Sequence, residues 1–298
     1  MTILREAVPI SFGYSILEAP RWHDGMLYAS DFFTHRVLRF EILAGKTEPT
    51  TVCVVEGQPA GLGFMPNGAL RVVSMQDRQL LEWDGSALSV VADFSALVAG
   101  PGNDMAISTD GTCFIGNFGM DADNPSVTAP TSLVRVAPDG SVALVANDVL
   151  FPNGIVIDET RGDFFVVETY RGRISRYTYT NGELSNREIW AQLVPDFGDY
   201  DVPEVTKKML MVPDGLAIDR DGALWVGDAK GHRAHRIAPG GEILEIVSTG
   251  ELTPYGLTLG GASGTTLFLG CAPPTETFNP VIERRGVLMS CEVDVPMP

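Results

Sequence analysis

Positive charge is scarce in this sequence. Among 298 residues there are 21 lysines and arginines against 38 aspartates and glutamates, which gives a net charge of -17. A surface of that sign repels nucleic acid and anionic membranes, so neither is an expected partner. No run reaches the roughly 18 apolar residues that span a bilayer. The N-terminus, "MTILREAVPISFGYS", has neither the basic start nor the apolar segment of a signal peptide, so we expect a cytoplasmic protein.

Cysteine is also sparse, and the cysteines do not have the spacing of a metal-binding or redox motif. The chain has no CxxC pair, and its cysteines are widely separated: Cys53, Cys113, Cys271 and Cys291. Reduced, partly buried thiols are therefore expected rather than a disulfide framework. The sequence also lacks a GxSxG segment, a P-loop and a dinucleotide fingerprint in a βαβ setting. A serine hydrolase of the GxSxG type and a nucleotide-binding enzyme are thus disfavoured.

What the sequence does contain is an internal repeat. The stretch "PDGLAIDRDGALWVGD" (213–228) resembles five others, found at residues 17–31, 59–74, 102–117, 152–168 and 254–270. Each copy has two short apolar runs around a turn rich in glycine, as at Asn67-Gly68, Asp110-Gly111 and Asp221-Gly222. That pattern is typical of a β-hairpin. Runs such as 78–84 and 89–94 lie between copies and fit a third and a fourth strand.

The period of the repeat predicts the fold. We call the second residue of each copy its repeat-start residue; the six are Glu18, Ala60, Asn103, Asn153, Asp214 and Tyr255. They are separated by 42, 43, 50, 61 and 41 residues, which is the period of four-stranded propeller blades. We therefore expect an all-β protein, a six-bladed β-propeller with four-stranded blades that forms a single domain over residues 1–298. A β-sandwich with coincidental hairpins is the alternative.

The two long intervals contain insertions, at residues 118–131 and 190–211. Loops of that length inside a compact repeat often carry function. Surface elaboration explains them equally well, so the sequence leaves both interpretations open.

Propeller symmetry brings equivalent residues of all blades to one ring around the axis. Four of the six repeat-start residues are oxygen donors: Glu18, Asn103, Asn153 and Asp214. Turn formation by Asn-Gly and Asp-Gly explains Asn153 and Asp214 singly, but Glu18 precedes Ala-Pro and Asn103 precedes an aspartate. The sequence therefore predicts one shared site. Gly215 is interpreted as the residue that lets the backbone turn into its strand.

The donor types in this predicted site favour a hard cation. Carboxylate and amide oxygens suit Ca²⁺, which takes six to eight oxygen ligands. Mg²⁺ and Mn²⁺ also bind oxygen, whereas Zn²⁺ normally recruits His or Cys. We expect one divalent metal ion, with Ca²⁺ favoured and Zn²⁺, Mg²⁺ or Mn²⁺ as alternatives. Tyr255 would line the mouth of the channel or serve in packing.

Four short segments, in this order along the chain, resemble the SMP-30/gluconolactonase/LRE family, also known as the regucalcin family. They are "LEAPRW", "GNDM", "PNGI" and "PDGLAID", and the resemblance extends over nearly the whole chain. It implies a six-bladed propeller that holds one divalent metal and hydrolyses a lactone. At matching positions, Glu18, Asn153 and Asp214 would be metal ligands, and Asp214 the general base. Asn103 would contact the substrate and the metal, and Asp104 the substrate.

Two positions depart from the family's pattern. Sugar-lactone members have an arginine two residues before the asparagine, where this chain has Pro101. A family glutamate in the following loop has no clear match, although Asp121 or Asp123 could substitute. Both differences weigh against a polar aldonolactone more than against lactone chemistry.

We therefore predict a metal-dependent lactonase that acts on a sugar lactone or a related small lactone. Metal-activated water would attack the carbonyl, with Asp214 as base and Asp104 in reserve. Two alternatives stay open: esterase or phosphotriesterase activity at the same metal, and a non-catalytic calcium-binding propeller. His232 and His235 lie three apart in an expected strand and so face opposite ways. We therefore expect them on an outer blade surface rather than as metal ligands.

Overall fold

The computed structural model describes residues 2–46, 48–120, 126–198 and 201–298, most of them in strands. The chain forms two compact units. Unit 1 combines Met1–Pro59 with Asp214–Pro298, and unit 2 is Ala60–Pro213. Each unit accounts for three sheets among the described residues, apart from Pro59 and Pro213, each of which belongs to the other unit than the rest of its strand. All strand pairs in these described sheets are antiparallel except β1 (Ile3–Glu6) with β22 (Ile243–Ser248).

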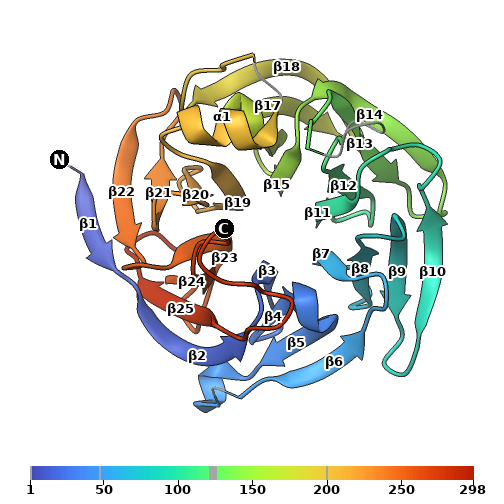
Figure 1. Cartoon of the computed structure of the whole chain (residues 1–298). Coiled ribbons are helices and arrows are strands. Elements are labelled where there is room, and N and C mark those ends of the chain that lie inside the picture. The colour runs from blue at the N-terminus through green and yellow to red at the C-terminus, as the bar shows by residue number, and fades with distance from the viewer. Residues whose placement is uncertain (1, 47, 121–125, 199–200) are drawn as a thin grey trace. The chain divides into compact units, whose positions relative to one another are not determined.

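Unit 1 contains the first repeat copy and the last two. One sheet has the order β3-β4-β5-β6: β3 (Leu17–His23), β4 (Met26–Asp31), β5 (Arg36–Phe40) and β6 (Thr50–Val54). The next is built on β23 (Thr253–Gly260), β24 (Thr266–Ala272) and β25 (Gly286–Glu292). The third contains β19 (Pro213–Ile218), β20 (Leu224–Asp228), β21 (Arg233–Ile237) and β22 (Ile243–Ser248). Figure 1 shows these strands in that order within each sheet.

The N-terminal segment supplies two strands to sheets made by the C-terminal part of the chain. β2 (Val8–Tyr14) pairs antiparallel with β25, with Val8 opposite Ser290. β1 (Ile3–Glu6) runs parallel to β22, with Ile3 opposite Glu245. In Figure 1 these blue strands lie beside red and orange ones. β2 is thus the fourth strand of a sheet that would otherwise have three, while β1 adds a fifth strand to its neighbour.

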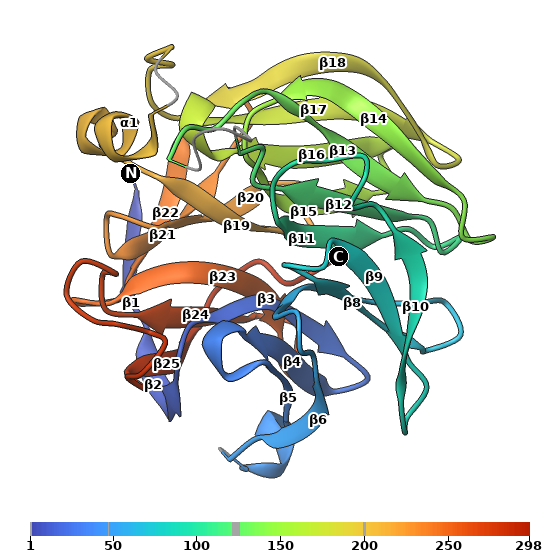
Figure 2. The ribbon, with the colours of Figure 1, turned by 45° about the vertical axis from the view of Figure 1, so that its right-hand side comes forward.

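Unit 2 contains the three middle copies. Its sheets are β7 (Pro59–Phe64), β8 (Leu70–Ser74), β9 (Gln79–Trp83) and β10 (Leu88–Asp93); β11 (Gly102–Ile107), β12 (Cys113–Asn117), β13 (Thr131–Val136) and β14 (Val142–Val149); and β15 (Pro152–Asp158), β16 (Asp163–Glu168), β17 (Arg173–Thr180) and β18 (Glu183–Gln192). Figure 2 shows the long pair β17 and β18 side by side, in yellow and green.

Short helices interrupt this pattern. The 3₁₀ turns are η1 (Phe32–Thr34), η2 (Ile42–Ala44) and η3 (Thr169–Arg171). The insertion at 190–211 contains α1 (Val202–Lys208), which the sequence did not lead us to expect. Asp201 caps its start by accepting a hydrogen bond from the Glu204 amide at 3.0 Å. No helix in the described part of the chain is long and apolar enough to cross a membrane.

The core explains why alternating apolar runs become these strands. In unit 1, Trp22 stacks on the fully buried Phe268 with ring centroids 5.5 Å apart. In unit 2, Phe114 packs edge-on against Phe164 at 5.0 Å. The hairpin turns have the predicted glycines, with positive φ at Gly68, Gly111 and Gly222. All four cysteines are free and buried, as expected.

The six sheets are the blades of a six-bladed β-propeller, so the predicted fold class is confirmed. The observed strands reproduce the repeat closely. For example, the runs at 78–84 and 89–94 become β9 and β10.

Gly215 has a different role from the one predicted. Its φ is not positive, so it does not serve to turn the chain. A Cβ on this residue would lie 2.7 Å from the Tyr255 carbonyl oxygen and 2.9 Å from the Gly256 Cα. Glycine is therefore required at this position because β19 approaches the backbone of β23 too closely for a side chain.

Gly215→Ala is accordingly expected to lower the free energy of unfolding by about 2 kcal/mol, since the added methyl group must displace main-chain atoms. Urea denaturation of the two proteins measures this. Gly85→Ala is a useful comparison, because Gly85 has φ +98 with open space around it and so reports backbone strain alone. An unchanged midpoint for Gly215→Ala would contradict the close-approach explanation.

Candidate active site

All six repeat-start residues lie at corresponding places in the fold. Each is the second residue of the first strand of its repeat, except Tyr255, which is the third. These six strands (β3, β7, β11, β15, β19 and β23) each form one edge of their sheet. The hairpin pattern therefore located the predicted site residues correctly within their strands.

The pairing of four of these strands is irregular at their repeat-start residues. Register shifts fall between Glu18 and Arg21, Gly102 and Met105, Pro152 and Ile155, and Pro254 and Gly256. Ala19 has a φ of 46°, which is uncommon for a residue with a side chain. Bulges re-aim side chains and are frequent next to active sites. Here the shifts interrupt the regular alternation of the strand at Glu18, Asn103, Asn153 and Tyr255.

Unit 1 contains Glu18, Asp214 and Tyr255. Asp214 is buried and Glu18 half-buried. Glu18 Oε2 lies over Gly256, 2.9 Å from where a Cβ would be. Burial raises the pKa of the Tyr255 phenol, and the charges of Asp214 and Glu18 raise it further. The three residues therefore share one electrostatic environment, in which Tyr255 remains a protonated hydrogen-bond donor at neutral pH.

Unit 2 contains Asn103, Asp104 and Asn153, all buried. Asn103 Nδ2 donates to the Pro152 carbonyl oxygen at 3.3 Å, and Asn153 Nδ2 donates to Thr169 Oγ1 at 3.4 Å. Asp104 Oδ1 accepts from the Met105 amide at 2.8 Å. Because the amide NH₂ groups bond the protein, the Oδ1 atoms of both asparagines are the atoms available to a ligand.

These donors fit a hard divalent cation. The predicted set offers two carboxylates and two amide oxygens, and buried anionic oxygens favour cation binding. No group of three or more His, Cys, Asp or Glu side chains arranged for metal binding occurs in the described residues. The predicted ligand set differs from such a group in two ways. Half of its donors are amides, and its members belong to both units.

Three aromatic rings of unit 2 pack against one another. Phe118 stacks on Phe151 with centroids 4.7 Å apart, and Phe151 meets Tyr170 edge-on at 4.9 Å. All three are half-exposed. Phe151 directly precedes Pro152-Asn153, and the Phe118 amide donates to the Pro101 carbonyl at 3.0 Å. The backbone of Phe118 is therefore bonded to Pro101, the position at which sugar-lactone members of the family are expected to have an arginine. The alternative carboxylates, Asp121 and Asp123, lie outside the described residues.

The histidine prediction was wrong for His235. This side chain is buried in β21, with Nε2 3.8 Å from Asp228 Oδ2, because the middle strand of a blade is covered on both faces. His232 lies in the turn before the strand.

Sequence reasoning also missed Thr169. It holds Asn153 through a side-chain contact between residues 16 apart, which no hairpin pattern signals.

Comparison with known proteins places these features in a family. Residues 16–272 match the family described as SMP-30/Gluconolactonase/LRE-like region. The chain is 26% identical over 231 residues to regucalcin of Danio rerio, covering 74% of this chain and 70% of that protein. It is 28% identical over 220 residues to a pentonolactonase of Haloferax volcanii, covering 70% of this chain and 65% of that protein.

Solved structures agree on the fold. A calcium-binding regucalcin from Agrobacterium tumefaciens superposes with a TM-score of 0.80 at 16% identity, covering 100% of this chain and 98% of that one. A luciferin-regenerating enzyme gives 0.77 at 18% identity, covering 96% and 94%. Since the family match spans most of the sequence, this chain belongs to the SMP-30/gluconolactonase/LRE-like family.

Proposed function

We propose that this protein is a lactone hydrolase that depends on a divalent metal ion. The observation that carries the proposal is the placement of Glu18, Asn103, Asn153 and Asp214 at corresponding positions of four propeller blades. Membership of the family supports it, as do relatives that bear the names gluconolactonase and pentonolactonase.

The proposed ligands are Glu18 and Asp214 from unit 1 and Asn103 and Asn153 from unit 2, with Ca²⁺ the favoured ion. A divalent ion held by these oxygens would polarise the lactone carbonyl and make water a better nucleophile at neutral pH. If the unit 1 and unit 2 ligands bind the same ion, the effects of substituting Asp214 and Asn153 on metal affinity should be non-additive in the double variant.

The chain's own residues supply the remaining chemistry. Asp214 accepts a proton from the attacking water, and Asp104 is the alternative base. Asn103 orients the lactone next to the base. Tyr255 donates a hydrogen bond to substrate oxygen, since a tyrosine phenol is protonated at neutral pH. Burial of these groups limits competing water, which strengthens each electrostatic interaction.

The aromatic cluster sets the expected substrate preference. Phe118, Phe151 and Tyr170 offer an apolar surface, and Pro101 offers no charge to a sugar hydroxyl. We therefore expect lactones with an alkyl or aryl substituent to have a higher kcat/KM than polyhydroxylated aldonolactones. A panel of γ- and δ-lactones that includes D-glucono-1,5-lactone measures this order.

Removal of divalent metal is the direct test of the mechanism. Exhaustive chelation is expected to abolish lactone hydrolysis, and added Ca²⁺, Mg²⁺, Mn²⁺ or Zn²⁺ should restore it to different degrees. Hydrolysis that survives chelation would contradict the metal mechanism. Turnover of phosphotriesters or aryl esters in place of lactones would assign the site a different reaction, and calcium binding without any hydrolysis would make the protein a binding propeller.

A further inference from the structure

Thr169 is unusual for its position in the blade. It directly follows the last residue of β16, the second strand of its repeat. In the other five blades the residue at this place is apolar: Phe32, Met75, Phe118, Ala229 and Pro273. Thr169 is nevertheless only 3% exposed. A buried hydroxyl at a position that is otherwise apolar requires hydrogen-bond partners, and here the partners belong to the candidate site.

The hydroxyl of Thr169 has one proton, so it can donate only one hydrogen bond. Thr169 Oγ1 donates to the Pro213 carbonyl oxygen at 2.9 Å. Its remaining capacity is to accept, and it accepts from Asn153 Nδ2 at 3.4 Å. Asn153 must therefore present its NH₂ group to Thr169 and turn Oδ1 the other way. Pro213 is also the residue that directly precedes Asp214 in the sequence.

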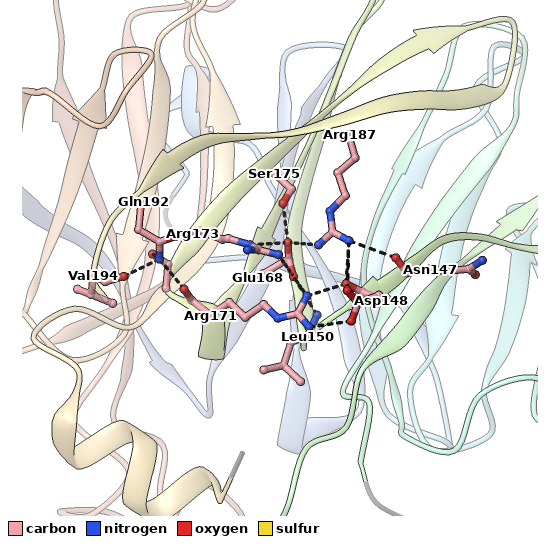
Figure 3. A network of polar contacts seen from close by, with 11 residues as sticks. Asn147, Asp148, Leu150, Glu168, Arg171, Arg173, Ser175, Arg187, Gln192 and Val194 are labelled. Atoms are coloured by element: carbon pink, nitrogen blue, oxygen red, sulfur yellow. Dashed lines mark hydrogen bonds and ion pairs between the residues drawn. The ribbon is translucent and has the colours of Figure 1, made fainter. Parts of the chain in front are cut away.

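Thr169 itself is held rigidly by its neighbours. Its amide donates to the Phe151 carbonyl at 3.3 Å. The preceding residue, Glu168, is fully buried and is bound by Arg171 Nη1 at 3.0 Å and Arg173 Nε at 2.9 Å. Figure 3 shows Glu168 at the centre of this network, with Ser175, Arg187 and Leu150 around it. Held in this way, the Thr169 hydroxyl is a fixed reference point for the Asn153 amide.

We propose that Thr169 is a positioning residue for metal binding, which it supports by fixing the Asn153 amide with its oxygen free to ligate. The inference rests on the proposed function, because Asn153 is a ligand in that proposal. Removing a group that hydrogen-bonds a metal ligand and so orients it commonly weakens metal affinity about 10- to 100-fold.

Calcium affinity is the measurement that tests it, by isothermal titration of the whole protein freed of metal by chelation. Thr169→Val preserves side-chain shape but removes the hydroxyl, and we expect a Kd about 10- to 100-fold higher. Thr169→Ser restores the hydroxyl and should bind within about threefold of the original protein. Thr249→Val is the matched control, because that buried hydroxyl donates to the Leu252 carbonyl at 2.6 Å rather than to a proposed ligand.

A second substitution distinguishes loss of Asn153 orientation from a general disturbance of the fold. Aspartate at position 153 has no NH₂ group to be oriented. In the Asn153→Asp background, Thr169→Val should therefore change Kd by less than about threefold, which is non-additive with its effect alone. Unchanged affinity in Thr169→Val, equal loss in Thr169→Ser, or full additivity in the double variant would each overturn the proposal.

The titration also separates this inference from the proposed function. Calcium binding that weakens as expected in a protein without lactonase activity would support Thr169 and overturn the lactonase proposal. Lactone hydrolysis by a protein that binds no divalent ion would overturn the role of Thr169 and the metal dependence of the proposed function, and would leave only the lactonase activity standing.

Discussion

Asp214→Asn should reduce kcat for lactone hydrolysis by about a thousandfold, because general-base catalysis contributes about 10²- to 10⁴-fold. Asparagine has nearly the same shape but cannot accept a proton from water. It also removes one of the two anionic donors of the proposed metal site. Steady-state kinetics at saturating metal and substrate measure the loss in kcat apart from any loss in metal affinity.

Asp221→Asn is the matched control for this variant. Asp221 lies in the hairpin turn between β19 and β20 of the same sheet, and its side chain is 66% exposed. We expect unchanged kinetics for it and unchanged circular dichroism for both variants. If Asp214→Asn kept full activity while Asp104→Asn lost it, the base would be Asp104 and Asp214 would serve only as a ligand.

Glu168→Gln should lower the free energy of unfolding by about 3 kcal/mol at neutral pH, since breaking a buried ion pair leaves charge uncompensated. Glu168 is fully buried. It forms ion pairs with three arginines: Arg171, Arg173 and Arg187. Glutamine keeps the shape and some hydrogen bonds but loses the negative charge. Urea denaturation at several pH values measures the difference.

The pH dependence of that difference follows from the pKa of Glu168. Burial alone raises this pKa, but hydrogen bonds from Arg173 and Ser175, with the charges of Arg173 and Arg187, lower it overall. A lowered folded-state pKa contributes stability above the unfolded value of about 4.3, and this stability is lost as the pH falls through the folded value. The two proteins should therefore differ most at neutral pH and converge in acid.

Glu188→Gln provides the comparison for charge loss at the surface. Glu188 pairs with Arg176 at 2.6 Å but its side chain is 55% exposed, so water screens the pair. We expect a change within about 0.5 kcal/mol. Equal effects of the two substitutions would show that the buried network is no more stabilising than a surface pair.

Most features that the sequence predicted correctly depend on residues close to one another along the chain. A hairpin is encoded by neighbouring residues, so Asp110-Gly111 and Asp221-Gly222 marked turns that the structure confirms. The same repeat located Glu18, Asn103, Asn153 and Asp214 at the start of their strands. Their roles as ligands and base remain predictions.

What the sequence could not predict depends on partners distant along the chain. β1 and β2 have weak strand signals of their own, and their partners lie more than 230 residues away. The contact of Thr169 with Pro213 spans 44 residues. Gly215 was misinterpreted for the same reason, because the atoms that exclude a side chain belong to β23. Local propensity contains no information about such neighbours.

The pairing of β2 with β25 has a consequence for how this protein is made. Val8 leaves the ribosome 282 residues before its partner Ser290, by subtraction of the two residue numbers. At 5 to 20 residues per second, β2 must wait on the order of half a minute for its partner. During that time its apolar residues have no sheet to join, and unpaired strands are prone to aggregation. This blade is therefore completed long after β2 has been made, and any factor that shields β2 on the nascent chain should raise the yield of folded protein.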